Sequence, residues 1–172
     1  LLEPRIFADD RGYFFESFNS GAFNSLLDRE VRFVQDNESH SKQGVLRGLH
    51  YQLTKPQAKL VRVVSGSVFD VAVDLRVESP TFGKWFGAIL SDENKKQLWI
   101  PEGFAHGFLV LSEHAKFQYK VTDYWYPEAE RCIAFDDPGI GIKWPLDCIN
   151  MANPQVSEKD RAGKLFKDAE IF

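Results

Sequence analysis

The sequence predicts an all-β protein, a sandwich or barrel of short strands with a few small helices at its edges. Aromatic residues make up 14% of the chain, and they gather with β-branched residues in short runs. Turn-forming segments such as SPTFG, SDENKK and YPEAE separate these runs at short intervals. Many short strands spaced in this way are typical of sandwiches and barrels.

The strand candidates follow one another along most of the chain. The clearest is residues 59–75, KLVRVVSGSVFDVAVDL, in which two β-branched runs flank a Ser-Gly-Ser turn and predict a β-hairpin. On its first strand, alternation places Lys59, Val61, Val63 and Ser65 on the inward face. The other candidates are residues 12–18, 31–39, 45–53, 84–90, 97–111, 115–126 and 131–137.

Two short helices are predicted at the periphery of the sheets. One covers residues 21–27, and the other opens at SEKD, where Ser157 and Asp160 fit a capping box. No repeat, low-complexity tract or linker divides the chain, so residues 1–172 are expected to form a single domain.

The charge and the cysteine content restrict the partners and the compartment. The net charge of -4 at pH 7 provides no broad basic field, which argues against a nucleic-acid polymer or an anionic membrane as partner. Any anionic ligand must then be bound by a few local cations. Cys132 and Cys148 form no CxxC pair, and no secretory segment or membrane-length apolar run occurs, so we expect a soluble protein of a reducing compartment.

The four histidines do not have the spacing of a metal site. A metal-binding β-barrel would place two histidines one residue apart, followed by a glutamate and a later histidine. His50 and His106 could meet in space, but two imidazoles alone make a thin coordination shell. We therefore expect no metal.

Residues 45–52, VLRGLHYQ, place an arginine and a histidine three positions apart in a strand-like run. Regular alternation puts Gly48 and His50 on one face and Arg47 on the other, unless the glycine introduces a bulge. Arg47 is then expected to reach a shared ligand from a bend, from a rim or across a subunit boundary. Taken alone, His50 is better explained as a core histidine than as part of a site.

Four further strand residues have both a structural and a chemical interpretation. Lys59 fits a fixed positive charge for an oxyanion, or an edge-strand lysine that opposes aggregation. His106 fits a pocket wall or the core. Tyr119 fits a proton donor, and Trp125 lies in a Tyr-Trp-Tyr cluster suited to stacking on a flat ring, although core packing explains each of them better when it is taken alone.

Polar residues in the first part of the chain give weaker signals. Arg11 and Glu16 flank an aromatic patch, whereas Gln35, Asp36 and Asn37 offer hydrogen-bonding groups. Turns and sheet edges are rich in such residues, so they do not define a site by themselves.

Taken together and in order, these motifs resemble the dTDP-4-dehydrorhamnose 3,5-epimerase family from about residue 1 to 165. The motifs are RGYFFES, FVQDN, VLRGLHYQ, KLVRVVSGSVFDVAVDLR, SPTFGKW, WIPEGFAHGF, YKVTDYWYPEAE, GIGIKWP and SEKD. The resemblance implies a cupin-type jelly roll of two antiparallel sheets, without metal or cofactor, in a cytoplasmic homodimer. It also implies inversion of carbons 3 and 5 of dTDP-4-keto-6-deoxy-D-glucose on the route to dTDP-L-rhamnose.

By motif position, the resemblance also implies a set of catalytic and binding residues. His50 would be the general base and Asp160 its orienting carboxylate. Tyr119 would deliver a proton from the opposite face, and Lys59 would steady the enolate. The positions that match substrate contacts are Arg11, Glu16, Gln35, Asp36, Asn37, Arg47, Lys59, His106, Glu130 and Lys159, and Trp125 matches the region that stacks on thymine.

Two departures from the family and three alternative functions stay open at this point. The first departure is the short segment between Gln52 and Lys59, which would reshape the rim of the pocket. The family commonly has a Tyr-Tyr pair where this chain has Tyr124 and Trp125; tryptophan also stacks on a base, so nucleotide binding is expected while the preference for thymine stays open. The alternatives are a single-carbon epimerase of a related nucleotide-linked keto sugar, a non-catalytic sugar-nucleotide-binding cupin, and a metal-dependent cupin oxygenase. The missing metal spacing argues against the oxygenase.

Overall fold

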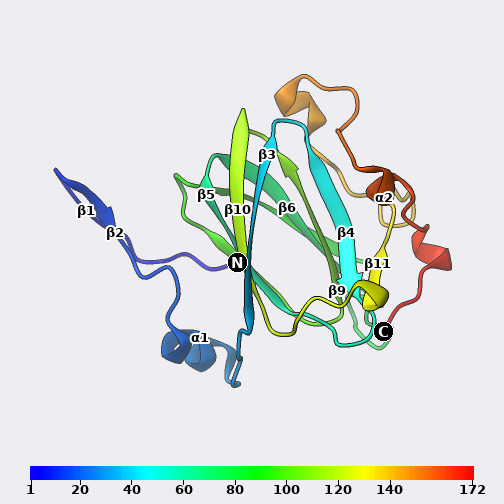
Figure 1. The fold of residues 1–172 in the computed structure, drawn as a ribbon, viewed down its shortest axis with the longest axis horizontal. Coiled ribbons are helices and arrows are strands. Elements are labelled where there is room, and N and C mark those ends of the chain that lie inside the picture. The colour runs from blue at the N-terminus through cyan, green and yellow to red at the C-terminus, as the bar shows by residue number, and fades with distance from the viewer.

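Two antiparallel β-sheets pack face to face in the computed structural model, which describes residues 1–172 (Figure 1). The four-stranded sheet contains, in spatial order, β3 (Gln35–Lys42), β10 (His114–Val121), β5 (Lys59–Ser65) and β8 (Gln97–Ile100). The five-stranded sheet contains β11 (Glu130–Cys132), β4 (Leu46–Gln52), β9 (Phe104–Val110), β6 (Ser67–Asp74) and β7 (Trp85–Ser91). The predicted all-β fold with two antiparallel sheets is confirmed.

A separate hairpin projects away from the two sheets (Figure 1). It consists of β1 (Phe7–Asp9) and β2 (Gly12–Phe14), which pair only with each other. Its residues are exposed to solvent. The strand predicted over residues 12–18 is therefore shorter than expected and lies outside the main sheets.

The core between the sheets is built from alternate residues of both inner faces. Val61, Val63 and Phe117 of the four-stranded sheet pack with Val68 and Phe108 of the five-stranded sheet. Burying an aliphatic or aromatic side chain of this size contributes about 1.5–3 kcal/mol. Because successive side chains of a strand point to opposite faces, this core also fixes the inward direction of polar residues on the same strands.

The outer face of the five-stranded sheet is covered by the chain that follows β11. Leu49 and Tyr51 of β4 pack there with Val71, Ile133 and Ile140. Strand β4 is consequently buried on both faces, and its backbone is held in place from both sides.

The helices lie outside the sheets, where the sequence predicts them. α1 (Ser20–Leu27) begins after Asn19, whose side chain accepts a hydrogen bond from the backbone N–H of Ala22 at 3.1 Å. α2 (Glu158–Arg161) begins after Ser157. The 3-10 turns are η1 (Pro127–Ala129), η2 (Leu146–Ile149) and η3 (Phe166–Asp168). None of the helices has the length and apolar character needed to span a lipid bilayer.

The hairpin predicted over residues 59–75 is wrong, although both of its strands exist. β5 pairs with β10 and β8, whereas β6 pairs with β9 and β7, so the chain passes from one sheet to the other at Gly66. Gly66 has a φ of 81°, and a Cβ there would lie 2.0 Å from the carbonyl oxygen of His114. Alternation cannot distinguish a hairpin from this corner, because each strand buries one face in either case.

A β-bulge at Gly48 changes the faces that β4 presents. Arg47 is the partner of Phe108 and His50 is the partner of His106, so three steps along β4 match two steps along β9. Arg47 therefore lies on the same face as His50, and the expectation of opposite faces is wrong. A Cβ on Gly48 would lie 2.5 Å from the backbone oxygen of His106, so this close approach requires glycine.

Candidate active site

His50 and Asp160 form a hydrogen-bonded pair although 110 residues separate them in the sequence. His50 Nε2 lies 2.5 Å from Asp160 Oδ1. Because an ionised carboxylate only accepts hydrogen bonds, the imidazole nitrogen is the donor. The ring of His50 is partly exposed, whereas Asp160 is buried behind it.

The segment that carries Asp160 is fastened to the five-stranded sheet at both ends. Gln155 forms a parallel bridge with Val45, and Lys164 forms another with Ile133. The short helix α2 lies between these two bridges. Its position therefore holds the carboxylate against the imidazole.

The electrostatic environment of Asp160 favours its charged form. Burial alone would raise the pKa of this carboxyl, but the hydrogen bond and the charge of His50 hold the pKa below its usual value. The backbone N–H of Gly48 also points at Asp160 Oδ2, at 3.5 Å. Ser157 Oγ accepts from the backbone N–H of Asp160 at 3.1 Å, so its predicted N-cap role is confirmed while the carboxylate itself turns to His50.

A cavity of about 310 Å³ lies beside His50 and receives side chains from both sheets. The lining residues are Gln35, Asn37, His50, Tyr51, Gln52, Gln57, Lys59, Tyr119, Trp125 and Glu130. Three residues with predicted roles in proton transfer or charge stabilisation, His50, Lys59 and Tyr119, thus meet around one space.

Lys59 is buried in the wall of this cavity. Its strand, β5, lies between β10 and β8, so the alternative of an edge-strand lysine is wrong. Burial lowers the pKa of Lys59 to about 8, while the negative charges of Asp70 and Glu130 favour the ammonium form. The side chain therefore offers a positive charge with little water around it.

Tyr119 approaches the cavity from β10. Its backbone partners are Asn37 on β3 and Val61 on β5, which both face inward. Burial raises the pKa of the Tyr119 phenol, and the positive charge of Arg47 opposes that rise. The phenol remains protonated at neutral pH, as a proton donor must.

A polar rim of three residues, Trp125, Glu130 and Lys159, borders the cavity. Trp125 Nε1 donates to Glu130 Oε2 at 3.1 Å, and Lys159 Nζ lies 2.6 Å from the same oxygen. Burial would raise the pKa of Glu130, but these two partners hold it below the usual value. Trp125 is 55% exposed, so much of its ring is free to stack on a ligand.

Two glutamines brace the loop that carries Trp125. Gln52 Oε1 accepts from the backbone N–H of Tyr126 at 2.7 Å, and Gln57 Nε2 donates to the backbone oxygen of Asp123 at 2.8 Å. The loop is therefore tied to residues that also line the cavity.

His106 is buried below the cavity rather than in its wall. Its Nε2 lies 2.9 Å from Asp70 Oδ2, and its ring stacks on Phe117 with the centroids 5.9 Å apart. Burial lowers the pKa of His106, although the charge of Asp70 opposes this shift. His106 is thus held as a neutral imidazole beside the residues that surround the cavity.

One cluster next to the cavity contains side chains of the metal-binding type. The candidate donor atoms of His50, Cys132 and Asp160 all lie within 4.8 Å of one another. However, burial raises the pKa of Cys132 to about 12, so the thiol does not ionise near neutral pH, and metals bind the thiolate. The Nε2 of His50 is already engaged by Asp160. This chemistry fits a proton-holding pair better than a metal centre.

Besides His106 and Lys159, four predicted substrate contacts do not line this cavity. Arg11 pairs with Asp9 on the projecting hairpin, and Glu16 accepts a hydrogen bond from the side chain of Asn19. Asp36 points to the outer face of the four-stranded sheet, where it pairs with Lys120 at 3.0 Å. Arg47 borders a neighbouring hollow together with His50 and Lys159, on the side of α2.

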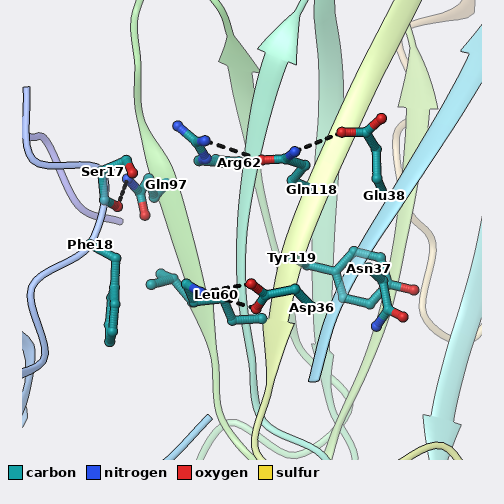
Figure 2. Close-up of a pocket in the computed structure, with 11 residues that line it drawn as sticks. Ser17, Phe18, Asp36, Asn37, Glu38, Leu60, Arg62, Gln97, Gln118 and Tyr119 are labelled. Carbon is teal, nitrogen blue, oxygen red and sulfur yellow. Dashed lines mark hydrogen bonds and ion pairs between the residues drawn. The ribbon is translucent and has the colours of Figure 1, made fainter. Parts of the chain in front are cut away.

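Figure 2 shows a second pocket, of about 280 Å³, on the outer face of the four-stranded sheet. Gln118 bridges Arg62 and Glu38, with donor–acceptor distances of 3.1 and 2.6 Å. Its charged side chains thus already have partners within the protein. None of the residues with a predicted catalytic role other than Tyr119 reaches it.

The sequence analysis overlooked Asp70, Gln52 and Gln57. Asp70 has a detectable signal, because it occupies an inward position of VFDVAVD between Val68 and Ala72. A carboxylate at such a position requires a partner inside the protein. The two glutamines give no comparable signal, because loop contacts decide their role.

The chain is similar to known proteins over nearly its whole length. A family model described as dTDP-4-dehydrorhamnose 3,5-epimerase matches residues 1–168. A dTDP-4-dehydrorhamnose 3,5-epimerase of Pseudomonas aeruginosa is 61% identical over 172 residues, which cover 100% of this chain and 93% of that protein. The enzyme of the same name from Salmonella typhimurium is 56% identical over 170 residues, which cover 98% of this chain and 91% of that protein.

A solved structure shares the fold closely. It is a dTDP-6-deoxy-D-glucose-3,5-epimerase from Legionella pneumophila in complex with dTDP-4-keto-L-rhamnose. The TM-score is 0.93 and the identity is 55%, over 98% of this chain and 87% of that one.

Proposed function

The chain belongs to the dTDP-4-dehydrorhamnose 3,5-epimerase family, and on this premise we propose that it converts dTDP-4-keto-6-deoxy-D-glucose into dTDP-4-keto-L-rhamnose. The observation that carries the proposal is the meeting of an imidazole–carboxylate pair, a phenol and a buried ammonium around one cavity. Each of these groups has a defined task in inverting a carbon next to a ketone.

His50 takes the proton in this reaction. The ketone at carbon 4 acidifies the hydrogens on carbons 3 and 5, so a base on one face of the sugar ring can remove them. Asp160 fixes the orientation of the imidazole and stabilises the imidazolium that forms. A positioned base of this kind contributes about 10²- to 10⁴-fold to the rate.

Lys59 and Tyr119 complete the inversion. Removal of the proton places negative charge on the oxygen at carbon 4, and the Lys59 ammonium stabilises that enolate in a site with little water. Tyr119 then supplies a proton to the opposite face of the carbon. The protons exchange with solvent and no electron leaves the sugar, so this chemistry requires no redox cofactor.

The rim and the neighbouring polar residues bind the nucleotide part of the substrate. The exposed ring of Trp125 stacks on the base, and Gln35 and Asn37 offer amide groups at the cavity wall. Arg47 and Lys159 supply the local cations that a diphosphate needs on a protein with a net charge of -4.

We also infer a homodimer in the cytoplasm. Arg11 and Glu16 lie outside their own cavity, so a partner subunit's cavity is where they would meet the substrate. Phe7 and Phe14 are 49% and 67% exposed, which gives the projecting hairpin an apolar surface to bury. Cys132 and Cys148 are free thiols, which supports a reducing compartment. Light scattering coupled to size-exclusion chromatography tests the dimer.

The decisive test is incubation with dTDP-4-keto-6-deoxyglucose in heavy water, followed by NMR of the sugar-ring protons. Deuterium is expected at both carbons, and His50→Ala is expected to abolish its incorporation. Incorporation at a single carbon would indicate a one-carbon epimerase instead. Binding of the nucleotide sugar without any exchange would indicate a non-catalytic binding protein.

A further inference from the structure

Asp70 is a fully buried carboxylate that the proposed mechanism does not use. It lies on β6, where Val68, Ala72 and Phe108 surround the inner face. Its Oδ2 accepts a hydrogen bond from His106 Nε2, but its Oδ1 has no hydrogen-bond partner. An unsatisfied buried carboxylate oxygen is costly, so fold stability alone does not explain this residue.

The basic neighbours of Asp70 come from two directions. His106 lies on β9, between the strand of Asp70 and β4, and its own backbone partners are His50 on β4 and Ala72 on β6. Lys59 belongs to the opposite sheet, and its ammonium is attracted by the Asp70 carboxylate across the core. Asp70 thus connects a histidine next to the candidate base with the lysine in the cavity wall.

We propose that Asp70 is a positioning residue of the epimerase, which orients His106 through a hydrogen bond and holds the positive charge on Lys59 through its own negative charge. This inference rests on the proposed function. It adds a buried carboxylate behind the cavity to the groups that meet the substrate.

The orientation of His106 follows from the hydrogen bond. Because the carboxylate accepts, Nε2 of the imidazole carries the proton, and Nδ1 of the neutral ring is left as an acceptor. A carboxylate that fixes the tautomer of a buried imidazole has the same effect as the outer partners of metal-bound histidines.

The charge on Lys59 depends on few groups. Burial lowers the pKa of Lys59 to about 8. The carboxylates that favour its ammonium form are Asp70 on β6 and Glu130 on β11. The other titratable groups around it are His106 on β9, His50 on β4 and Tyr119 on β10, and none of them is negative near neutral pH. Glu130 is itself paired with Lys159. Removing the Asp70 charge therefore leaves Lys59 with a single, shared counter-charge.

The test is Asp70→Asn, which keeps the size of the side chain and a hydrogen-bond acceptor for His106 but removes the charge. In the parent enzyme, kcat/KM is expected to fall above about pH 8 as Lys59, with its pKa of about 8, loses its proton. In Asp70→Asn that alkaline decline is expected to begin at lower pH, and kcat/KM at neutral pH to fall by about 10- to 100-fold.

The matched control is Asp74→Asn on the same strand. Asp74 is equally buried, but it is bound by Arg76, Ser79 and Thr81 outside the cavity. Asp74→Asn is expected to lower the free energy of unfolding without moving the pH profile. A pH profile unchanged in folded Asp70→Asn, or moved equally in Asp74→Asn, overturns the proposal.

A second variant, Asp70→Glu, keeps the proposal testable if Asp70→Asn does not fold. It retains the charge while displacing His106, so kcat is expected to fall with the alkaline decline still near pH 8; a displaced decline overturns the proposal. A parent enzyme without any solvent exchange would refute the proposed function itself, which is a separate outcome.

Discussion

The two histidine–aspartate pairs of this protein are chemically alike and their histidines lie on neighbouring strands, yet their surroundings differ. In the open pair, His50–Asp160, the side chains are 27% and 5% exposed, and the ring reaches the cavity. In the closed pair, His106–Asp70, the side chains are 7% and 0% exposed. His50 and His106 are paired with each other in the register of the adjacent strands β4 and β9. The difference in exposure therefore arises between two neighbouring positions of one sheet.

The comparison supports the two proposed roles, a proton carrier for the open pair and a support for the closed pair. A base must exchange its proton with substrate and solvent, which requires an open face; His50 has one and His106 does not. Burial lowers the pKa of His106 and keeps its ring neutral. The open pair is completed by a carboxylate on a separate short helix, and the closed pair by a carboxylate inside the sheet.

The largest effect is expected from a substitution that removes the charge of the open pair but keeps its shape. Asp160→Asn retains the size of the side chain but no longer stabilises an imidazolium, so kcat is expected to fall by about 10²- to 10⁴-fold. The rate of deuterium incorporation measures this. The melting temperature of the variant serves as control, and a kcat close to that of the parent would contradict the role of Asp160.

The next effect breaks the closed pair. His106→Ala removes the hydrogen-bond donor to the buried Asp70 carboxylate, and it is expected to lower the free energy of unfolding by about 1.5–3 kcal/mol. Urea denaturation measures the loss. His50→Ala provides the comparison, because the cavity admits water to Asp160, and it should cost less; equal losses would show that the two pairs do not differ in this respect.

The smallest effect is expected from a substitution at the helix that holds the carboxylate of the open pair. Ser157→Ala removes the N-cap of α2 and is expected to cost about 0.5–2 kcal/mol, with a moderate loss of kcat because Asp160 is held less firmly. Asn19→Ala removes the N-cap of α1, far from the cavity, and is the matched control. A similar cost in stability with unchanged kcat is expected for it, and a loss of kcat as large as that of Ser157→Ala would show a general effect of destabilisation.

The sequence predicts the strands well because alternation records which side chains are buried. It fails where the pairing of strands is decided by distant residues: Gly66 reads as a hairpin turn, but β5 and β6 join different sheets. The strand predicted over residues 115–126 also ends early, at Val121, and Trp125 lies in a loop. Pattern identifies a strand, whereas tertiary contacts select its partners and ends.

The candidate site is predictable only in part for the same reason. The family motifs predict that His50, Lys59, Tyr119 and Asp160 belong to one site. In the structure, these four residues lie around one cavity or directly behind it. No local pattern relates Asp70 to His106, because the two are 36 residues apart and meet only when β6 pairs with β9. Side chains that support other side chains are therefore the ones that the sequence analysis overlooks.

The bulge at Gly48 shifts the alternation of side chains along β4 by one residue. Before it, the odd-numbered Arg47 lies on the inner face of the sheet while staying exposed; after it, the even-numbered His50 and Gln52 point to the cavity on that face. Without this bulge, a regular ladder over the same residues would turn either the arginine or the imidazole away from the inner face, although the composition would be unchanged. At this position the number of residues carries as much chemical information as their identity.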